Sequence, residues 1–393
     1  MSETRTRTID DAERRARLAV RHRLAGSARA ATAEEVGDAL VALHGTDPAS
    51  VFLAVGARLA GGAGPVATVE RALYEDRSLV RMHGMRHTVF VFPSSLAPAV
   101  HSSTTHPAAV RERDVLLRHL AEGSAFDAAW LAETERLVLA ELAVRGEATG
   151  TELGAAVPRL RETYVYGPGT RQEGVQSVAS RVLRVLGMEG RIVRGRPQGT
   201  WTSSRFRWAL AGEHPPVAAS EARAELIRRW LAACGPASEA DLKWWTGWKV
   251  TDVRGALAAV GAAPVTLAGG TGFVLPDDLD PVPDPEPWAA LLPALDPTAM
   301  GWQARDWYQD PEHRAALYDR SGNIAPTVWW NGRIVGVWAQ RPDGAIVHRL
   351  LADVGGEAER AIGAEAARLA AWVGEVRVTP RFRTPLEREL AAP

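Results

Sequence analysis

Hydrophobic residues near the start of the chain recur with the spacing of helices. Residues 10–23 predict an Arg-rich helix. Thr32 and Glu35 then match a capping box, and the apolar spacing behind them predicts a helix that stops at His44-Gly45. Asp47-Pro48 predicts that a further helix starts there and runs through Arg58, because Asp caps helices and Pro suits the first helical turn. A short helix is expected over 69–74.

The apolar pattern changes after these helices. Residues 79–92 alternate around Gly84 and predict two short strands that form a hairpin. Helices followed by a hairpin are the element order of a winged helix, so we expect a winged-helix unit over 8–100.

The same element order recurs twice, which makes a chance match less credible. In the second copy, over 125–212, the expected elements are helices at 127–144, 149–156 and 173–188 and a hairpin at 191–208. In the third, over 218–280, they are helices at 220–233, 238–246 and 251–260 and a hairpin of 264–267 with 272–275.

A proline-rich acidic stretch, 277–287, reads as a linker to a last domain, 288–393. Asn331-Gly332 between alternating apolar residues predicts a tight hairpin. Further strands are expected at 336–340, 346–351 and 376–380, with a helix at 357–373. The predicted class is α+β: three tandem winged-helix units followed by a small, barrel-like, β-rich domain.

Composition narrows the classes of protein to which the chain can belong. The net charge is -1, so any nucleic-acid surface must be a local basic patch. The basic residues are almost all Arg, which a GC-rich genome or phosphate binding would each explain. One cysteine excludes an internal disulfide and a cysteine-based metal site, and we expect no metal and no cofactor. Because no long apolar run exists, we expect a cytoplasmic protein with no membrane association.

The segment Leu43-His44-Gly45-Thr46-Asp47-Pro48 is the first candidate for chemistry. It places an imidazole and a hydroxyl two residues apart on a short turn, where both can orient a water molecule. A structural interpretation stays open, in which His44 ends a helix, Thr46 satisfies turn amides and Asp47 caps the next helix.

Several strings, in order along the chain, resemble the AlkZ/YcaQ family of winged-helix DNA glycosylases. The resemblance covers roughly residues 10–390. It lies in the strings 43–48 (LHGTDP), 85–93 (MRHTVFVFP), 235–238 (GPAS), 241–247 (DLKWWTG), 292–297 (LPALDP), 322–328 (GNIAPTV) and 331–338 (NGRIVGVW).

The resemblance implies excision of bulky or cross-linked alkylated guanines from double-stranded DNA, as a monomer, in repair or in self-resistance to an alkylating antibiotic. The family's catalytic turn carries Gln-x-Gln or Gln-x-Asp, whose place His44 and Thr46 take here. We expect these two side chains to be catalytic and Asp47 to add support through its negative charge. A cationic alkylguanine leaves readily, so the turn has only to steady the sugar and place one water. With no lysine near the turn, a Schiff-base step is not expected.

We expect DNA contacts mainly from basic residues on the wings and beside the tryptophans of the third unit. The candidates are Arg81, Arg86, His87, Arg171, Arg191, Arg194, Arg196, Lys243 and Lys249. The segment 162–171 is either a loop or hairpin that probes the groove at the lesion or an ordinary surface loop.

Three functions therefore stand at this point. The first is a monofunctional DNA glycosylase. The second is a winged-helix transcription regulator, although the chain has no coiled-coil heptads for dimerisation. The third is a lesion-binding protein that shields adducts without excision.

Overall fold

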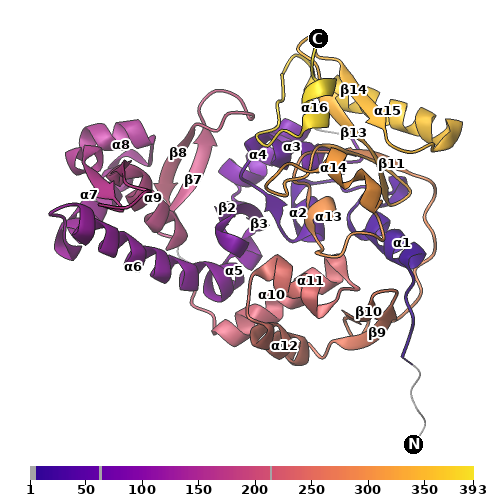
Figure 1. The fold of residues 1–393 in the computed structure, drawn as a ribbon, viewed down its shortest axis with the longest axis horizontal. Coiled ribbons are helices and arrows are strands. Elements are labelled where there is room, and N and C mark those ends of the chain that lie inside the picture. Colours follow the sequence, from indigo (N-terminus) through magenta and orange to yellow (C-terminus); the bar gives the residue numbers. More distant parts are fainter. Residues whose placement is uncertain (1–5, 62–63, 213–214) are drawn as a thin grey trace, which may run out of the picture. The chain divides into compact units, whose positions relative to one another are not determined.

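The computed structural model describes residues 6–61, 64–212 and 215–393 (Figure 1). Contacts divide the chain into two compact units. Unit 1 consists of Met1–Val80, Phe90–Leu96 and Arg223–Pro393, and unit 2 of Arg81–Val89 and Ala97–Ala222. The predicted division into four domains stays a prediction.

Unit 1 begins with short helices whose starts are capped as the sequence predicts. The Thr32 hydroxyl accepts the Glu35 N–H at 3.1 Å, and an Asp47 carboxylate oxygen accepts the Ala49 N–H at 3.2 Å. Such caps satisfy N–H groups that have no partner inside the helix. The helices are α1 (Asp11–Arg21), α2 (Ala33–Leu40), α3 (Pro48–Gly56) and α4 (Pro65–Glu70).

The prediction that the second helix continues to His44 is wrong. Helix α2 ends at Leu40, because Val41 has φ 63° and ψ -46° and the Ala42 N–H donates to the Leu40 carbonyl at 2.6 Å. This is a γ-turn of the rarer, strained kind. The chain then extends into strand β1 (Leu43–His44), which pairs antiparallel with strand β3 (Val89–Pro93) at Val91 and Phe90.

A second part of unit 1 follows the predicted order of helices and a hairpin. A buried Trp230 lies in the first of these helices, and Ser238 caps the second with a complete capping box. The elements are α10 (Ala219–Cys234), α11 (Glu239–Thr246), α12 (Val250–Ala259), β9 (Ala263–Leu267) and β10 (Gly270–Val274).

The C-terminal part of unit 1 is an antiparallel four-stranded sheet in the order β11-β12-β13-β14. Its predicted Asn331-Gly332 turn is confirmed, with both residues at positive φ. Helix α15 packs against β11, β12 and β14, and α16 against β13. The predicted strand at 376–380 is wrong, because this segment is extended without a ladder. The elements are β11 (Ala289–Leu292), β12 (Thr327–Trp330), β13 (Arg333–Gln340), β14 (Ile346–Leu350), α15 (Gly355–Val373) and α16 (Pro385–Leu390).

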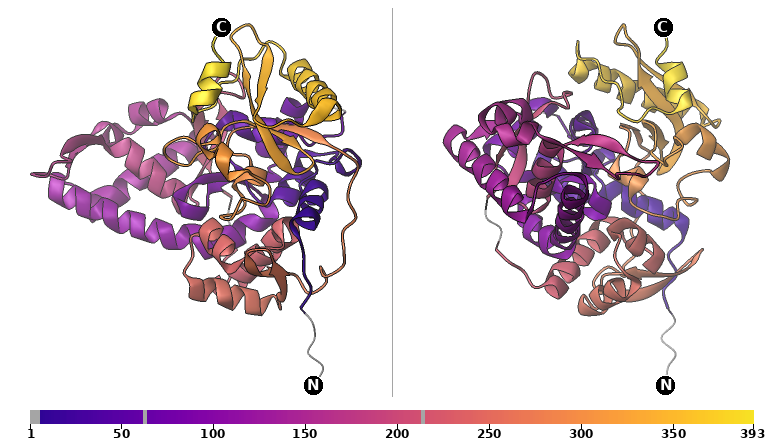
Figure 2. Two further views of the ribbon diagram at one scale, coloured as in Figure 1. Left: turned by 45° about the vertical axis from the view of Figure 1, so that its right-hand side comes forward. Right: turned by 60° about the vertical axis from the view of Figure 1, so that its left-hand side comes forward.

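Unit 2 contains the predicted second helix-and-hairpin order, around a core that includes Leu131, Val138 and Leu186. Three helices precede a hairpin that β4 extends to a three-stranded sheet, β4-β8-β7. Figure 2 shows this arrangement from two further sides. The elements are α7 (Ala128–Arg145), β4 (Glu147–Ala148), α8 (Gly150–Ala156), α9 (Val178–Met188), β7 (Ile192–Pro197) and β8 (Phe206–Leu210).

Two elements of unit 2 differ from expectation. The predicted helix over 173–188 starts only at Val178, because strand β6 (Gly174–Ser177) pairs with β5 (Thr163–Tyr166). The interrupting segment is thus a hairpin whose loop carries Arg171. No element is predicted for 106–123, where the structure has helix α6 (His106–Gly123).

With 48% helix and 18% strand in small antiparallel sheets, the structure confirms a mixed helix–strand class. The finer prediction of three tandem winged helices stays a prediction. Within the described ranges, no helix has both the length and the apolar character needed to cross a membrane.

Candidate active site

The turn from Leu43 to Pro48 is held between a strand and a helix. β1 fixes His44 by its pairing with Phe90, and the His44 ring stands edge-on to the Phe90 ring with centroids 5.2 Å apart. Both His44 and Thr46 are partly exposed, whereas their neighbours Gly45 and Asp47 are buried. The turn therefore presents the imidazole and the hydroxyl residue, spaced as the sequence predicts, on a rigid support.

Asp47 has a structural role that the sequence shows only in part. One carboxylate oxygen caps α3, and the other accepts the main-chain N–H of Arg381 at 3.0 Å. Burial raises the pKa of Asp47, and the N–H donors of Arg381 and Ala49 act in the opposite direction. Because both carboxylate oxygens already accept hydrogen bonds, the capping interpretation of Asp47 is supported. Its catalytic contribution stays a prediction.

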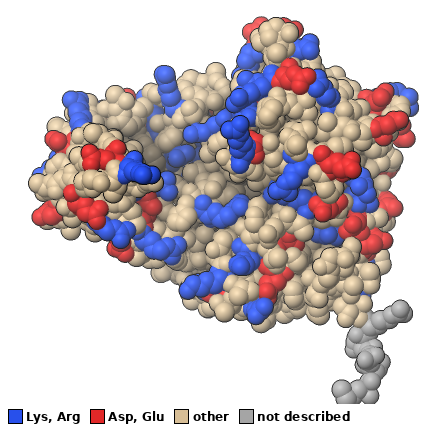
Figure 3. All heavy atoms as spheres, viewed as in Figure 1, with Lys and Arg blue, Asp and Glu red and all other residues tan. Residues whose placement is uncertain are grey.

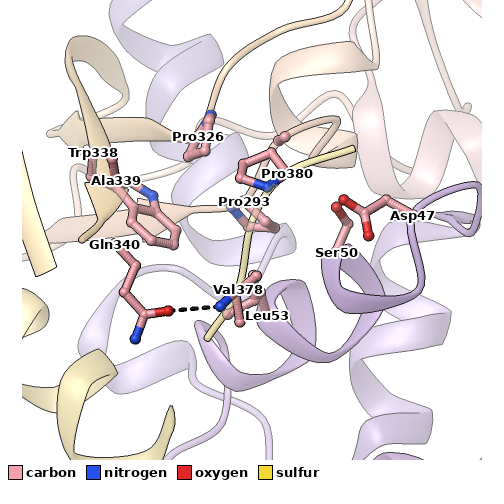
Figure 4. A pocket seen from close by; sticks show the side chains of 11 residues that line it. Asp47, Ser50, Leu53, Pro293, Pro326, Trp338, Ala339, Gln340, Val378 and Pro380 are labelled. Atoms are coloured by element: carbon pink, nitrogen blue, oxygen red, sulfur yellow. Dashed lines mark hydrogen bonds between the residues drawn. The ribbon is translucent and has the colours of Figure 1, made fainter. Parts of the chain in front are cut away.

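A small pocket lies beside Asp47 within unit 1. Ser50 and Leu53 of α3 line it together with residues of β13 and of the extended segment after α15. Figure 4 shows Asp47 and Ser50 at one end of the pocket and, away from them, Gln340, whose side-chain oxygen accepts the Val378 N–H at 2.8 Å. The Gln340 bond joins the extended segment to the sheet, and the Asp47 bond joins it to α3.

Helix α3 is anchored at its other end by a fully buried ion pair. Arg58 and Asp296 are both 0% exposed, and the guanidinium binds the carboxylate with two hydrogen bonds of 2.7 and 2.9 Å. Three further acceptors complete its shell, namely the Thr298 hydroxyl at 2.7 Å, the Ala54 carbonyl at 2.8 Å and the His22 carbonyl at 2.9 Å. Because the N–H groups of the guanidinium have these acceptors, the charge of Arg58 can be buried.

His22 belongs to the same buried cluster. Its Nδ1 lies 2.9 Å from the Thr298 hydroxyl, its Nε2 lies 3.6 Å from the Cys234 sulfur, and its ring stacks on Trp302. Burial, followed by the charge of Arg58, lowers the pKa of His22 to about 3. Burial also raises the pKa of the Cys234 thiol, so the pair is neutral and unreactive at ordinary pH.

The predicted DNA contacts within unit 2 divide by exposure. Arg86 and His87 are exposed on a tight turn where both have positive φ, and Arg171 is exposed in the β5–β6 loop. Arg81, in contrast, is only 5% exposed. A guanidinium buried to that extent cannot reach a DNA phosphate, so the structure does not support a direct contact by Arg81.

The β7–β8 hairpin of unit 2 carries the other three arginines. Arg191 forms ion pairs with Glu135 at 3.1 Å and Glu189 at 3.8 Å, so its charge is largely matched by protein carboxylates. The Arg194 guanidinium lies over the Phe206 ring, 4.3 Å from its centroid. Arg196 is half-buried on β7. The structure thus leaves these residues on the predicted hairpin but gives Arg191 and Arg194 partners within the protein.

Lys243 and Lys249 are exposed, Trp245 and Trp248 between them are buried, and Trp244 is partly exposed. Trp245 and Trp248 are only 7% and 9% exposed, so these two rings belong to the protein core. On the face drawn in Figure 3, both basic and acidic side chains lie at the surface, with the basic ones more frequent towards the middle of the view.

Sequence reasoning missed one basic residue beside the turn. Arg381 is exposed, and its Nη1 lies 3.5 Å from the Thr46 carbonyl oxygen. The only sequence signal is a cluster of arginines, Arg377, Arg381 and Arg383, which lies far from the turn along the chain.

Comparisons with known proteins place this geometry in a family. The chain is similar to an interstrand DNA cross-link repair glycosylase of Streptomyces sahachiroi, with 29% identity over 180 residues, which make up 42% of this chain and 48% of that relative. This match spans about half the length of the relative. The solved structure of the S. sahachiroi DNA glycosylase AlkZ has a TM-score of 0.65 and 23% identity, and the alignment covers 94% of this chain and 99% of that one.

The structural likeness shows a shared fold. The family itself comes from a model described as DNA glycosylase AlkZ-like, which matches residues 36–372. The matched range contains the turn at His44 and Thr46 and most of both units. It confirms the resemblance on which the sequence prediction rests: this chain belongs to the AlkZ-like family of DNA glycosylases.

Proposed function

We propose that this chain is a monofunctional DNA glycosylase that hydrolyses the N-glycosidic bond of bulky alkylated guanines in double-stranded DNA. The match of the AlkZ-like family model to residues 36–372 carries the proposal. Because the S. sahachiroi relative is named for interstrand cross-link repair, we include cross-linked guanines among the substrates. The biological role would be base excision repair or self-resistance to a DNA-alkylating natural product.

The proposed chemistry needs a positioned water and little else. Alkylation of the imidazole ring makes guanine cationic, so the bond between C1′ and the base breaks with both electrons passing to the base. The oxygen of a water molecule bonds to C1′, and its proton passes to the His44 imidazole or to solvent. We assign His44 and Thr46 to hold this water, because positioning and electrostatic stabilisation supply most of such a rate enhancement.

The rigid attachment of the turn supports this assignment. His44 is fixed by strand pairing and by the Phe90 ring, and Asp47 begins α3 directly behind Thr46. A water held by two groups on such a support keeps its orientation, which loosely held groups would not ensure. The proposal extends to Asp47, whose buried carboxylate adds negative charge behind a cationic sugar.

We propose that the three winged-helix units, 8–100, 125–212 and 218–280, grip the duplex around the lesion. The exposed candidates Arg86, His87, Arg171, Lys243 and Lys249 are the best placed for phosphate contacts. Arg191, Arg194 and Arg196 would need to exchange protein partners for DNA. The enzyme would act as a monomer in the cytoplasm, without a metal or another cofactor.

The test is base release from defined duplexes. Duplex DNA with one bulky alkylguanine adduct is incubated with wild type, His44→Ala, Thr46→Ala and the matched control His348→Ala, a partly exposed histidine on β14. Free base and heat-labile abasic sites are then quantified. We expect wild type and the control to release base and both turn variants to be slower by about 10²-fold or more.

Each alternative gives a different result. No release by wild type from any bulky adduct would refute the glycosylase proposal. Full-rate release by both turn variants would refute the site assignment. Protection of a single sequence-specific site in footprinting would point to a transcription regulator instead.

A further inference from the structure

The segment Val378–Arg383, which we call the strap, joins the candidate catalytic turn to the C-terminal sheet. At one end the Val378 N–H donates to the Gln340 side chain at 2.8 Å. Further along, the Arg381 N–H donates to Asp47 at 3.0 Å. In Figure 4 the strap runs past Val378 and Pro380, with Gln340 on one side of it and Asp47 and Ser50 on the other. The strap thus fixes the main chain of Arg381 beside the turn.

This attachment does not depend on the arginine side chain. The acceptor is a buried carboxylate oxygen of Asp47, and a hydrogen bond to a buried charged group is among the stronger ones. Every residue except proline would supply the same N–H. The main-chain hydrogen bond therefore fixes the position of Arg381, and its side chain is available for another function.

The three arginines around the strap differ in what their guanidinium groups contact. Arg383 binds both carboxylate oxygens of Glu387, and Arg377 donates to main-chain carbonyls, including that of Pro342 at 2.9 Å. The Arg381 guanidinium makes the long 3.5 Å contact to the Thr46 carbonyl, lies 5.9 Å from the Phe382 ring centroid and, through its charge, acts to lower the pKa of the Asp47 carboxyl. Among the described residues, no carboxylate lies within ion-pair distance of its guanidinium, and the side chain is exposed.

A positive charge at this place fits one part of the substrate better than the others. It would repel the cationic sugar and the cationic alkylated base, so it cannot serve the reacting atoms directly. The backbone phosphates on either side of that sugar are anionic, and the planar guanidinium binds phosphate with paired hydrogen bonds. A phosphate contact also fixes the register of the strand on the protein.

We propose that Arg381 binds a backbone phosphate next to the target nucleotide and so seats the sugar over the turn at His44 and Thr46. This inference rests on the proposed function for the identity of the bound strand. In this proposal the strap holds Arg381 where its guanidinium can bind the phosphate, and the C-terminal domain thereby contributes to DNA binding.

The first measurement is binding, which does not require excision. The probe is a duplex with one tetrahydrofuran abasic site, and its Kd is measured for wild type, Arg381→Gln, Arg381→Lys and the control Arg349→Gln over a range of KCl concentrations. Arg349 is an exposed arginine of β14 that is paired with Glu389, so its variant loses the same charge elsewhere. For Arg381→Gln we expect binding weaker on the order of tenfold and a salt slope smaller by about 1, with partial recovery in Arg381→Lys.

The second measurement locates the phosphate. Single methylphosphonate linkages, which are uncharged, replace each phosphate near the abasic site in turn. We expect one position to weaken binding by wild type and to have no further effect on Arg381→Gln. Asp47→Ser keeps a side-chain oxygen for the α3 cap but loses the strap acceptor, so it should show the same reduced salt slope. Melting curves confirm that each variant is folded.

Equal Kd and salt slope for wild type and Arg381→Gln would overturn the inference, even if excision is fast. A methylphosphonate effect of equal size in both proteins would overturn it too. If wild type binds as expected but excises no adduct, only the proposed glycosylase function fails, because the phosphate contact is decided by binding alone.

Discussion

The buried pair of Arg58 and Asp296 allows the sharpest test of how unit 1 holds α3. Asp296→Asn keeps the size of the side chain and removes its charge. The guanidinium of Arg58 would then remain fully buried with only neutral acceptors around it. Removing one partner of such a pair costs about 3–5 kcal/mol, because the remaining charge is neither solvated nor matched.

The expected change is measurable as a melting temperature. For a unit of this size, 1 kcal/mol corresponds to about 2–4 °C, so Asp296→Asn should lower the melting temperature of unit 1 by about 6–20 °C. Arg58→Met should lower it as well, because Asp296 then keeps its charge without the guanidinium. The double variant Arg58→Met/Asp296→Asn has no buried charge, and its loss should be smaller than the sum of the two single losses.

Thermal and denaturant unfolding of the four proteins gives the coupling energy. Glu239→Gln, which breaks an exposed ion pair with Arg254, is the control and should melt close to wild type. Additive losses in the double variant, or a single-variant loss no larger than that of the control, would refute the reasoning. Because Arg58 lies two residues beyond the end of α3, we also expect Asp296→Asn to lower the rate of base excision at temperatures where it is still folded.

Three further predictions follow from other sites. His44→Gln introduces the glutamine that the resemblance assigns to the catalytic turn, so it should excise at a rate within about tenfold of wild type while His44→Ala stays slow; equal rates for the two variants would contradict the water-holding role. Because the pKa of His22 is lowered to about 3, the folded unit binds fewer protons than the unfolded chain between pH 6.5 and 3. The free energy of unfolding should therefore decrease by about 1.4 kcal/mol for each unit by which the pH is lowered within that window. His22→Asn should flatten that slope in denaturant titrations at pH 6.5 and 5, and an unchanged slope would exclude His22 as its source. A Cβ on Gly123 would overlap the main-chain carbonyl of Val165, so Gly123→Ala should lower the melting temperature of unit 2, whereas Gly174→Ala in the same unit, where a Cβ meets nothing within 4 Å, should not.

Local signals in the sequence predicted the parts of the fold that local chemistry determines. Thr32 and Asp47 cap helices as expected, and Asn331-Gly332 forms the hairpin turn. In each case a side chain or a glycine satisfies the geometry of residues that are close along the chain. The capping signals were therefore enough to place the start of α3 directly after the candidate turn.

The errors arise where distant pairing overrides the local pattern. Helical spacing continues to Leu43, yet β1 forms because β3 offers it a partner. The helical pattern over 173–188 fails at its start for the same reason, since Gly174–Ser177 pairs with β5. Conversely, the alternation at 376–380 predicts a strand, but no neighbouring strand pairs with it and the segment serves as part of the strap.

The sequence predicted the part of the candidate site that lies within one short segment of the chain. The string 43–48 identified His44, Thr46 and Asp47, and the family match now includes that segment. Arg381 could not be predicted, because nothing in the sequence indicates that its N–H meets Asp47. The burial of Arg81 could not be predicted from the sequence either, because the alternation of residues in a short strand does not show which face of the strand is covered.

The γ-turn at Val41 has a consequence for engineering. A β-branched residue at φ 63° costs roughly 1–3 kcal/mol, and glycine would relieve that strain. Glycine would also allow the chain between α2 and β1 to take up many directions, whereas valine has few. Because Val41 is itself only 1% exposed, glycine would also remove a buried side chain, so Val41→Gly is expected to melt no higher than wild type and to orient the turn at His44 less precisely.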